Sequence, residues 1–150
     1  MSETNLHAVA VILDDRGVLI RGDSGSGKTA LGLALLTHWR SGGRPAFMVA
    51  DDQVFVAGRR GRLVVSAPVP IRGLAEARGY GPAALGTEPR MVADLVVHLV
   101  KPHEAPRMAG NRRVHIEGCE LPCLDLPARD AVGGVLAVAA WFSAPPFGTE

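Results

Sequence analysis

Residues 22–29 read Gly22-Asp23-Ser24-Gly25-Ser26-Gly27-Lys28-Thr29 and match the pattern G-x-x-x-x-G-K-[ST] at every position. A short apolar run, Val18-Leu19-Ile20, comes before this stretch, and a helix-like apolar run over residues 30–36 follows it. This strand–loop–helix context is what phosphate binding needs, because the glycines let backbone N–H groups turn inward and the helix N-terminus adds its positive end. The stretch therefore predicts a P-loop whose eight residues are all candidate nucleotide-binding residues.

The lysine and threonine of this loop have expected partners in a nucleoside triphosphate. In a P-loop the lysine reaches the β- and γ-phosphates, and the hydroxyl that follows it coordinates Mg²⁺. These positions are Lys28 and Thr29. We therefore expect Lys28 to neutralise phosphate charge and Thr29 to be a metal ligand.

A pair of neighbouring carboxylates, Asp51 and Asp52, ends the apolar strand expected over residues 46–50. A P-loop magnesium site needs an acidic residue at such a strand end. Two adjacent side chains point in different directions from an extended backbone. Asp51 can thus face the metal while Asp52 faces a substrate hydroxyl as general base. A turn or helix-cap role for one of the pair, Asp51 in particular, is the alternative.

The rest of the chain predicts one α/β domain over residues 1–150 with a mixed sheet. Gly and Pro punctuate the apolar runs, and neither an internal repeat nor a linker divides them. The expected elements are strands over residues 8–13, 18–20, 46–50 and 92–100, a hairpin from 54–56 and 63–65 around Gly58–Gly61, a loop over 68–89, a basic turn-rich stretch over 101–113 and a helix over 131–142.

Composition excludes several classes of protein. Hydrophobic residues make up 47% and charged residues 21%, which is typical of a globular domain, and a net charge of +1 gives no global attraction for nucleic acid or an acidic membrane. Cys119 and Cys123 have no further cysteine or suitably spaced histidine for a zinc site, so we expect two buried thiols. The chain shows no leader pattern and no apolar run of membrane-spanning length, so we expect a cytoplasmic protein.

With a histidine near the start, His7, these motifs resemble a known family. The loop G-x-S-G-x-G-K and the strand end Ala50-Asp51-Asp52 look like the catalytic domain of HPr kinase/phosphorylase. The resemblance runs from His7 to about Ala140. It implies a PEP-carboxykinase-like P-loop fold, ATP with Mg²⁺, phosphorylation of a serine of the phosphocarrier HPr in a bacterial sugar phosphotransferase system, and assembly as a homo-oligomer, typically a hexamer.

The resemblance also implies roles for single residues. The family's N-terminal catalytic histidine matches His7, one residue before the first expected strand. Its P-loop lysine and Mg²⁺-binding hydroxyl match Lys28 and Thr29. Its Asp-Asp pair matches Asp51 and Asp52, of which the second accepts the proton from the HPr serine.

Two further family segments have approximate counterparts. The family has a Glu-Ile-Arg-Gly-x-Gly segment whose Glu binds magnesium. Residues 76–81 match it better than residues 70–73, because the match over 70–73 has Pro70 at the position of the Glu. Glu76 is therefore the expected metal ligand. A family Arg that stabilises the transferring phosphoryl has its nearest counterpart in Arg107, and Arg112 or Arg113 would serve the same electrostatic purpose.

The chain departs from the family in two places. The usual separate N-terminal domain has no counterpart, so we expect a catalytic domain alone. The late segment tied to the reverse, phosphorolytic reaction is Pro-Gly-Arg-Asn-like in the family but reads Leu126-Pro127-Ala128-Arg129-Asp130 here. The reverse reaction and the role of Arg129 are thus left open.

Two other functions fit the P-loop. A small-molecule kinase would need a lid of arginines, which Arg107, Arg112 and Arg113 could supply. A non-catalytic ATP-binding sensor would need no base, and the carboxylate pair argues against it. Outside these motifs we expect His98 to be structural, and the arginines of the 59–62 hairpin tip to be solvated or to form a docking patch.

Overall fold

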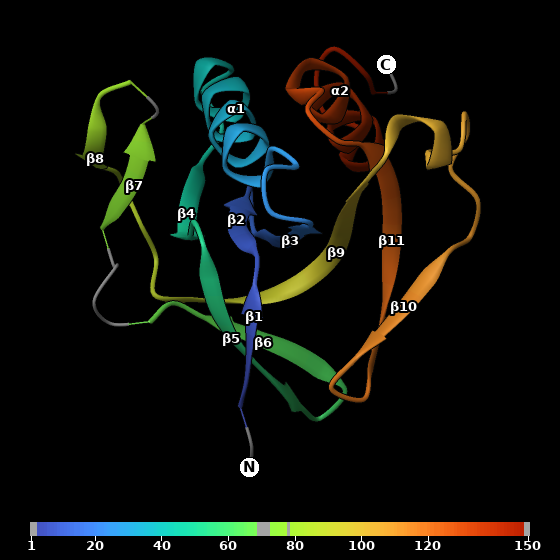
Figure 1. Ribbon diagram of the computed structural model, residues 1–150, viewed down its shortest axis with the longest axis horizontal. Helices are drawn as coiled ribbons and strands as arrows, with labels where there is room; N and C mark the ends of the chain where they lie inside the picture. Colours follow the sequence, from blue (N-terminus) through green and yellow to red (C-terminus); the bar gives the residue numbers. More distant parts are fainter. Residues whose placement is uncertain (1–2, 69–72, 78, 149–150) are drawn as a thin grey trace.

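The computed structural model describes residues 3–68, 73–77 and 79–148, which form a curled mixed sheet with two helices on one face (Figure 1). The elements are β1 (Thr4–His7), β2 (Val9–Leu13), β3 (Arg16–Gly22), α1 (Lys28–Ser41), β4 (Ala46–Ala50), β5 (Gln53–Arg59), β6 (Arg62–Ser66), β7 (Leu74–Ala77), β8 (Gly81–Ala84), β9 (Arg90–Val100), the 3₁₀ helix η2 (Pro102–Glu104), β10 (Arg113–Ile116), β11 (Cys119–Pro127) and α2 (Ala131–Phe142).

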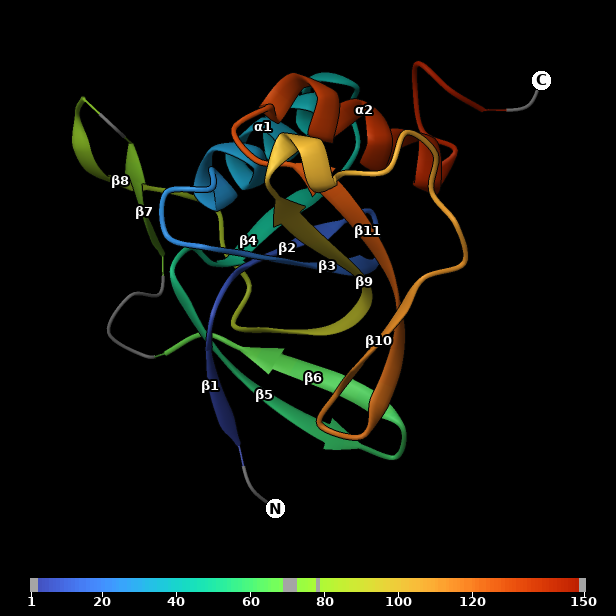
Figure 2. The same cartoon turned by 45° about the vertical axis from the view of Figure 1, so that its right-hand side comes forward.

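Strand β9 organises the sheet, whose main order is β1-β5-β6-β9-β3-β2-β4. It runs parallel to β3 on one side. On its other side the first residues pair antiparallel with β6, and residues 96–100 pair parallel with β11. Because β6 and β11 share one edge of a single long strand, the sheet divides there and curls, as Figure 2 shows. The mixed α/β sheet expected from the sequence is confirmed.

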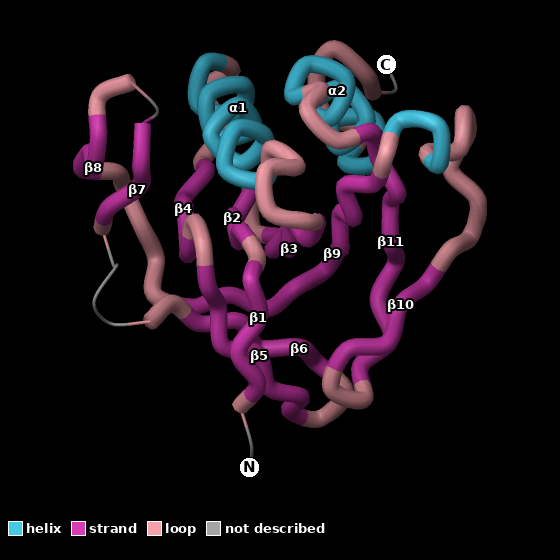
Figure 3. The backbone as a smooth tube through the Cα atoms, viewed as in Figure 1, coloured by secondary structure: helices cyan, strands magenta, loops and turns pink. Residues whose placement is uncertain are grey.

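The two faces of the sheet carry separate cores, as strand alternation requires. In β2, Val9, Val11 and Leu13 pack under the helices, while Ala10 packs into the core enclosed by the curled half. Both helices lie over the same face of the sheet (Figure 3). A Cβ on Gly32 would lie 2.8 Å from Val9 Cγ1, so the missing side chain lets α1 lie close to β2. The P-loop helix is thus held firmly against the sheet.

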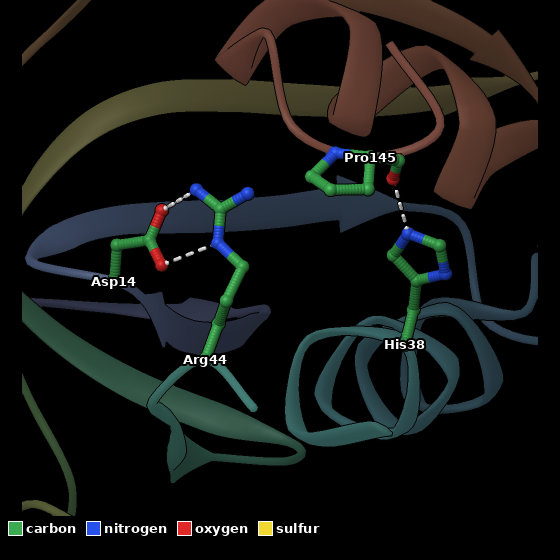
Figure 4. Close-up of polar contacts among 4 residues, drawn as sticks. All are labelled: Asp14, His38, Arg44 and Pro145. Carbon is green, nitrogen blue, oxygen red and sulfur yellow. Dashed lines mark hydrogen bonds and ion pairs between the residues drawn. The ribbon is translucent and has the colours of Figure 1, made fainter. Parts of the chain in front are cut away.

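The C-terminal end of α1 is held by polar contacts with other parts of the chain (Figure 4). His38 Nε2 lies 2.7 Å from the carbonyl oxygen of Pro145, which follows α2. Arg44, just beyond the helix, forms an ion pair with Asp14 in the β2–β3 turn, with Nε 3.0 Å from Oδ1. The guanidinium of Arg44 also lies over the buried ring of Trp39.

The structure corrects three expectations about elements. The stretch expected as a loop over 68–89 contains the hairpin β7–β8, which stands beside α1 (Figures 1 and 2). The hairpin turn lies at Arg60-Gly61, and Gly58 belongs to β5, where a Cβ would meet Glu117 O at 2.4 Å. Strands β1, β10 and β11 are not among the expected elements. The helix predicted over residues 131–142 matches α2.

Two smaller expectations agree with the structure. Cys119 and Cys123 are both buried and unpaired by any disulfide. Among the described residues, no helix combines the length and the apolar character that a bilayer crossing requires.

Candidate active site

The P-loop joins the end of β3 to the start of α1, as the sequence predicts. Gly25 and Gly27 have φ angles of 80° and 95°, a left-handed conformation that glycine adopts without strain. Gly27 is the N-cap of α1, which has no side-chain cap and no acidic residue in its first turn. The first N–H groups of the helix are therefore left for an anion, with the helix dipole in its favour. The loop fits a phosphate group.

The first glycine of the loop is fixed by a close contact. A Cβ on Gly22 would lie 2.6 Å from Ser26 Oγ and 3.1 Å from Leu99 O. Ser26 is buried, and its N–H donates to Asp23 O over 3.0 Å. The loop therefore folds back on its own start and forms a compact ring of backbone groups.

Lys28 and Thr29 connect this loop to its surroundings. Lys28 Nζ donates to Gly22 O at 2.9 Å and to Asp23 O at 3.0 Å, so the ammonium group lies across the loop. Thr29 Oγ1 donates to Asp51 O at 3.0 Å, which ties the start of α1 to the end of β4. The threonine hydroxyl and the carboxylate pair are thus brought together as expected.

One cavity of about 400 Å³ contains five of the eight predicted P-loop residues and both aspartates of the pair. Its lining residues are Ser24, Gly25, Gly27, Lys28, Thr29, Ala30, Leu33, Asp51 and Asp52. Among the residues that the structure describes, no cluster of three or more His, Cys, Asp or Glu side chains forms a ready metal cage. Mg²⁺ at a kinase site is generally held by one or two carboxylates together with substrate phosphates and water. The cavity therefore fits a Mg²⁺–nucleotide complex, and Thr29 and Asp51 are the residues that would hold the metal.

His7 lies beside the carboxylate pair, although not where the sequence suggested. It is the last residue of β1 and pairs with Gln53, directly after Asp52. The next residue, Ala8, donates its N–H to Asp52 O over 3.0 Å. The expectation that His7 precedes the first strand is wrong, since the strand β1 adds to the sheet edge at β5. The pairing of β1 with β5 places His7 opposite Gln53, next to the Asp51–Asp52 pair in the chain.

A second cavity, of about 290 Å³, begins where the P-loop begins. It is lined by His7, Arg21, Gly22, Asp23, Val96, His98, Arg112, Val114 and Cys123. Asp125 links two of these side chains, with Oδ1 3.2 Å from His98 Nδ1 and Oδ2 2.6 Å from Arg112 Nε. Sequence reasoning missed this cavity and expected His98 to be structural. The signal that could have revealed a role for His98 is its position in β9 opposite Asp125 of β11, and this position is known only once the register of the two strands is known.

Arg129, whose role the sequence left open, lies against the P-loop. Its backbone N–H donates to Ser26 O over 2.8 Å, and Nε donates to Gly25 O over 2.9 Å. Asp130 caps α2 by accepting the N–H of Gly133. The segment between β11 and α2 thus supports the loop from outside.

Among the predicted site residues whose side chains the structure describes, Ser26 and Arg107 line neither cavity. Arg107 is exposed in the loop between η2 and β10. Glu76 lies in β7 of the hairpin beside α1, opposite Pro82, and its side chain is outside the described set. Arg78 of the chosen family segment, and Pro70 of the alternative match over residues 70–73, also lie outside the described residues.

Comparisons with known proteins agree on one family. Residues 1–132 match the family model described as HPr Serine kinase C-terminal domain. A protein of Limosilactobacillus reuteri named HPr kinase/phosphorylase is 41% identical over 103 residues, covering 63% of this chain and 30% of the relative. One of the same name from Chromobacterium violaceum is 36% identical over 118 residues, covering 73% and 35%. This chain therefore spans about a third of the length of these relatives.

A solved structure shares the fold. The structure titled Hpr(Ser) kinase/phosphatase from Coxiella burnetii superposes with a TM-score of 0.75 and 24% identity, covering 93% of this chain and 88% of that one. The likeness therefore extends beyond the P-loop to almost the whole chain.

Proposed function

The chain belongs to the family of HPr serine kinase C-terminal domains, and on this premise we propose that it is an ATP-dependent kinase that phosphorylates a serine of an HPr-like phosphocarrier protein. One observation carries the proposal. The backbone carbonyl of Asp51 accepts a hydrogen bond from the Thr29 hydroxyl, and the backbone carbonyl of Asp52 accepts one from the N–H of Ala8. The backbone that carries the two carboxylates is thereby fixed between the P-loop and the end of β1, and both aspartates line the same cavity as Lys28, where a transfer reaction needs a base.

The proposed mechanism assigns one task to each group. When bound, Mg²⁺–ATP supplies the transferable phosphoryl group and neutralises part of its charge. The P-loop N–H groups and Lys28 would hold the phosphates, and Thr29 and Asp51 would hold the metal, with Glu76 of the β7–β8 hairpin as the proposed third ligand. Asp52 accepts the proton of the serine hydroxyl as the serine oxygen bonds to phosphorus and the bond to the leaving ADP oxygen breaks. His7 orients the reacting groups from the neighbouring strand.

The arginine that stabilises the transferring phosphoryl group is part of the proposal. Support for Arg107 comes from the family resemblance, and it would have to act from an exposed loop. Arg112 lines the cavity that begins at Gly22, and Arg129 is hydrogen-bonded to the P-loop itself. We also propose that residues 1–150 act as one catalytic domain in the cytoplasm and as a homo-oligomer, for which sedimentation at several protein concentrations is the test.

A direct assay tests the function. The protein is incubated with ATP, Mg²⁺ and the HPr-like protein of the same organism, and the phosphate is located by mass spectrometry. We expect phosphoserine on the acceptor with the wild-type protein and none with Lys28→Ala. Transfer to a nucleoside or sugar in place of the protein would indicate a small-molecule kinase. Tight ATP binding with no transfer to any acceptor would indicate a sensor, and either result would overturn the proposal.

A further inference from the structure

Helix α2 is apolar around its whole circumference, although one side of it lies at the surface. Residues 131–142 read AVGGVLAVAAWF and include no charged side chain. A surface helix usually turns polar and charged residues toward water, and a helix that is apolar all round is normally buried. The inward side of α2 follows this rule, since Val135, Val138 and Ala139 pack into the core under the helices. The outward side is apolar without being buried.

The two glycines of α2 are explained by contacts within the chain. A Cβ on Gly134 would lie 2.7 Å from Leu31 Cδ1, so this glycine lets α2 lie close to α1. A Cβ on Gly133 would overlap Asp130 Oδ2, so this glycine makes room for the side chain that caps the helix. The feature that these contacts leave unexplained is the set of larger apolar side chains on the outward side.

Three apolar residues form an exposed stripe along that side. Val132, Leu136 and Ala140 follow one another at intervals of four residues, which places them on one side of the helix. Val132 is 76% exposed, Leu136 is 41% exposed, and Ala140 is exposed as well. We name these three residues the α2 stripe. The family match ends at residue 132, so most of the stripe lies beyond the part of the chain that shows the family.

The charges at the two ends of α2 favour a second copy of this chain as the partner. Asp130 lies at the N-terminal end, where it caps the helix. The guanidinium of Arg16 lies at the C-terminal end, 5.7 Å from the ring centroid of Trp141. When two copies of α2 pack antiparallel about a two-fold axis, Asp130 of each copy is brought toward Arg16 of the other. The two helix dipoles then also run in opposite directions.

The other charges at these ends have partners of their own. Arg129, next to Asp130, directs its guanidinium to Gly25 O of the P-loop. Beside Arg16, the carboxylate of Asp14 is bound by Arg44.

The last charged residue of this turn, Asp15, lines a cavity that Arg62 of β6 also lines. Among the described residues, Arg16 is thus the cation at this end of α2 that has no ion pair. A carboxylate from a second copy would supply one.

We propose that two copies of this chain associate through the α2 stripe, packed antiparallel with Leu136 of each copy against Leu136 of the other. The stripe carries no charge, so the contact buries no unpaired ion. Side chains spaced by four residues form the ridges that interdigitate in the commonest class of helix packing. A formal net charge of +1 gives little repulsion between copies.

The size of the contact predicts how tight the association is. A single helix of 12 residues offers less surface than the roughly 800 Å² per partner of a stable interface. We therefore expect a reversible association that depends on protein concentration. This contact gives the homo-oligomer of the proposed function a specific face, and it does not depend on the kinase reaction.

The first test compares two leucines of similar exposure. Leu136 is 41% exposed, and Leu74 of the β7–β8 hairpin, which lies on the other side of α1 from α2, is 46% exposed (Figure 1). Each is changed to Glu, and sedimentation velocity is measured over a wide range of protein concentration without nucleotide or acceptor. We expect the wild type and Leu74→Glu to associate alike. Leu136→Glu should associate at least about tenfold more weakly, because each copy would bring an unpaired carboxylate into the contact.

A second variant separates association from folding. Val132→Glu changes the most exposed residue of the stripe and should weaken association in the same way, while denaturant unfolding shows the wild-type midpoint. A wild type that stays monomeric at every concentration would overturn the proposal. So would association of Leu136→Glu and Val132→Glu that equals that of Leu74→Glu.

Cross-linking tests the position of the two-fold axis. Cys119 and Cys123 are buried, so a cysteine introduced at the surface is the reactive one. A disulfide needs Cα atoms within about 7 Å of each other, which the proposed packing provides for residue 136. On oxidation with copper phenanthroline, Leu136→Cys should form covalent dimers and Leu74→Cys should not. Equal yields from the two variants would indicate random collision and contradict the packing.

The acceptor protein is the alternative occupant of the stripe. If the wild type sediments as a monomer and Leu136→Glu weakens its binding to the HPr-like protein, the stripe is an acceptor surface and self-association is overturned. Phosphoserine formation is measured separately. A monomer that still forms phosphoserine would overturn the α2 contact and leave the kinase function standing, whereas a dimer that transfers no phosphate would do the reverse.

Discussion

Helix α1 begins at Lys28 without a side-chain cap. At its other end, after Ser41, backbone N–H groups of the following residues donate hydrogen bonds back to the last turn of the helix. At the N-terminal end the backbone N–H groups of the first turn have no acidic or hydroxyl side chain to satisfy them. At the C-terminal end the N–H groups of Gly42, Gly43 and Arg44 all donate to carbonyls of the last turn. At the N-terminal end of this helix the backbone N–H donors are thus available to a ligand. At the C-terminal end the backbone carbonyl acceptors are satisfied by the chain itself.

The side chains repeat this difference. Lys28 at the first end reaches loop carbonyls that an incoming phosphate would compete with. At the other end Arg40 Nε donates to Ala46 O over 2.8 Å, His38 contacts Pro145, and Arg44 pairs with Asp14 (Figure 4). Trp39 adds an edge-to-face contact with Phe142 of α2 at 5.2 Å between ring centroids. We therefore expect substitutions at the N-terminal end of α1 to change activity more than stability. Substitutions at the C-terminal end should change stability more than activity.

Lys28→Ala should have the largest effect on activity. A cation that clamps the transferring phosphate contributes about 10³–10⁵-fold to phosphoryl transfer, so the rate should fall by that factor. The two hydrogen bonds lost are to carbonyls at an open loop, so the free energy of unfolding should change by no more than about 1 kcal/mol. Steady-state transfer to the acceptor protein and denaturant unfolding measure the two quantities. A large loss of stability with activity retained would reverse the assignment of the two ends.

Asp52→Asn tests the base at the same end. General-base catalysis contributes about 10²–10⁴-fold, and kcat should fall by that factor. The substitution keeps the backbone carbonyl that accepts the Ala8 N–H, so the backbone at this strand end and the affinity for ATP should persist. The matched control is Asp51→Asn, which should raise the Mg²⁺ concentration needed for half-maximal rate. Near-normal transfer by Asp52→Asn would show that another group accepts the serine proton.

The N-terminal end of α1 could be predicted from the sequence because its chemistry is local. Residues 22–29 form one continuous motif between a strand and a helix, and Asp51-Asp52 directly follow the next strand. The second cavity, which begins at Gly22, could not be predicted in the same way. Its residues come from β1, β3, β9, β11 and the β10 region, and only the parallel register of β11 on β9 sets Asp125 opposite His98.

Other elements escape sequence analysis for local reasons. Strand β11 contains Pro122 and ends at Pro127, and proline removes a ladder donor and argues against a strand. Pro122 is accommodated because it lies beside Arg113 of the short terminal strand β10. The β7–β8 hairpin is hidden because four glycines and four prolines interrupt residues 68–89, although its ends pair as Leu74 with Ala84 and Ala77 with Gly81.

Arg129→Ala should have a moderate effect on the N-terminal end. Its guanidinium donates to Gly25 O at an exposed position, so its loss should loosen the loop and raise KM for ATP by about threefold to tenfold, which corresponds to a typical net hydrogen bond of about 0.5–1.5 kcal/mol. The neighbouring Asp130→Ala provides the control, because it removes the N-cap of α2 and should cost about 1 kcal/mol of stability with KM unchanged. If both variants change stability alone, Arg129 supports the fold and does not position the loop.

Asp14→Asn tests the C-terminal end and should have the smallest effect. Asp14 has a φ of 59°, which asparagine tolerates, so the substitution removes the charge and keeps the turn. The hydrogen bond from Arg44 lowers the pKa of Asp14, so the pair stabilises the protein above the ordinary aspartate value of about 3.9 and loses this contribution as the pH falls through the lowered value.

The expected difference in unfolding free energy is at most about 1 kcal/mol at neutral pH, since both partners are partly exposed. Denaturant unfolding from pH 7 down to about 3, across the ordinary aspartate range, should show the wild-type advantage shrinking toward zero while kcat at neutral pH stays the same. An advantage that is constant with pH would mean that it does not come from the charge of Asp14, and no advantage at any pH would leave the contact of Arg44 with Trp39 as what holds this end of α1. A fall in kcat would show that the two ends of the helix are coupled.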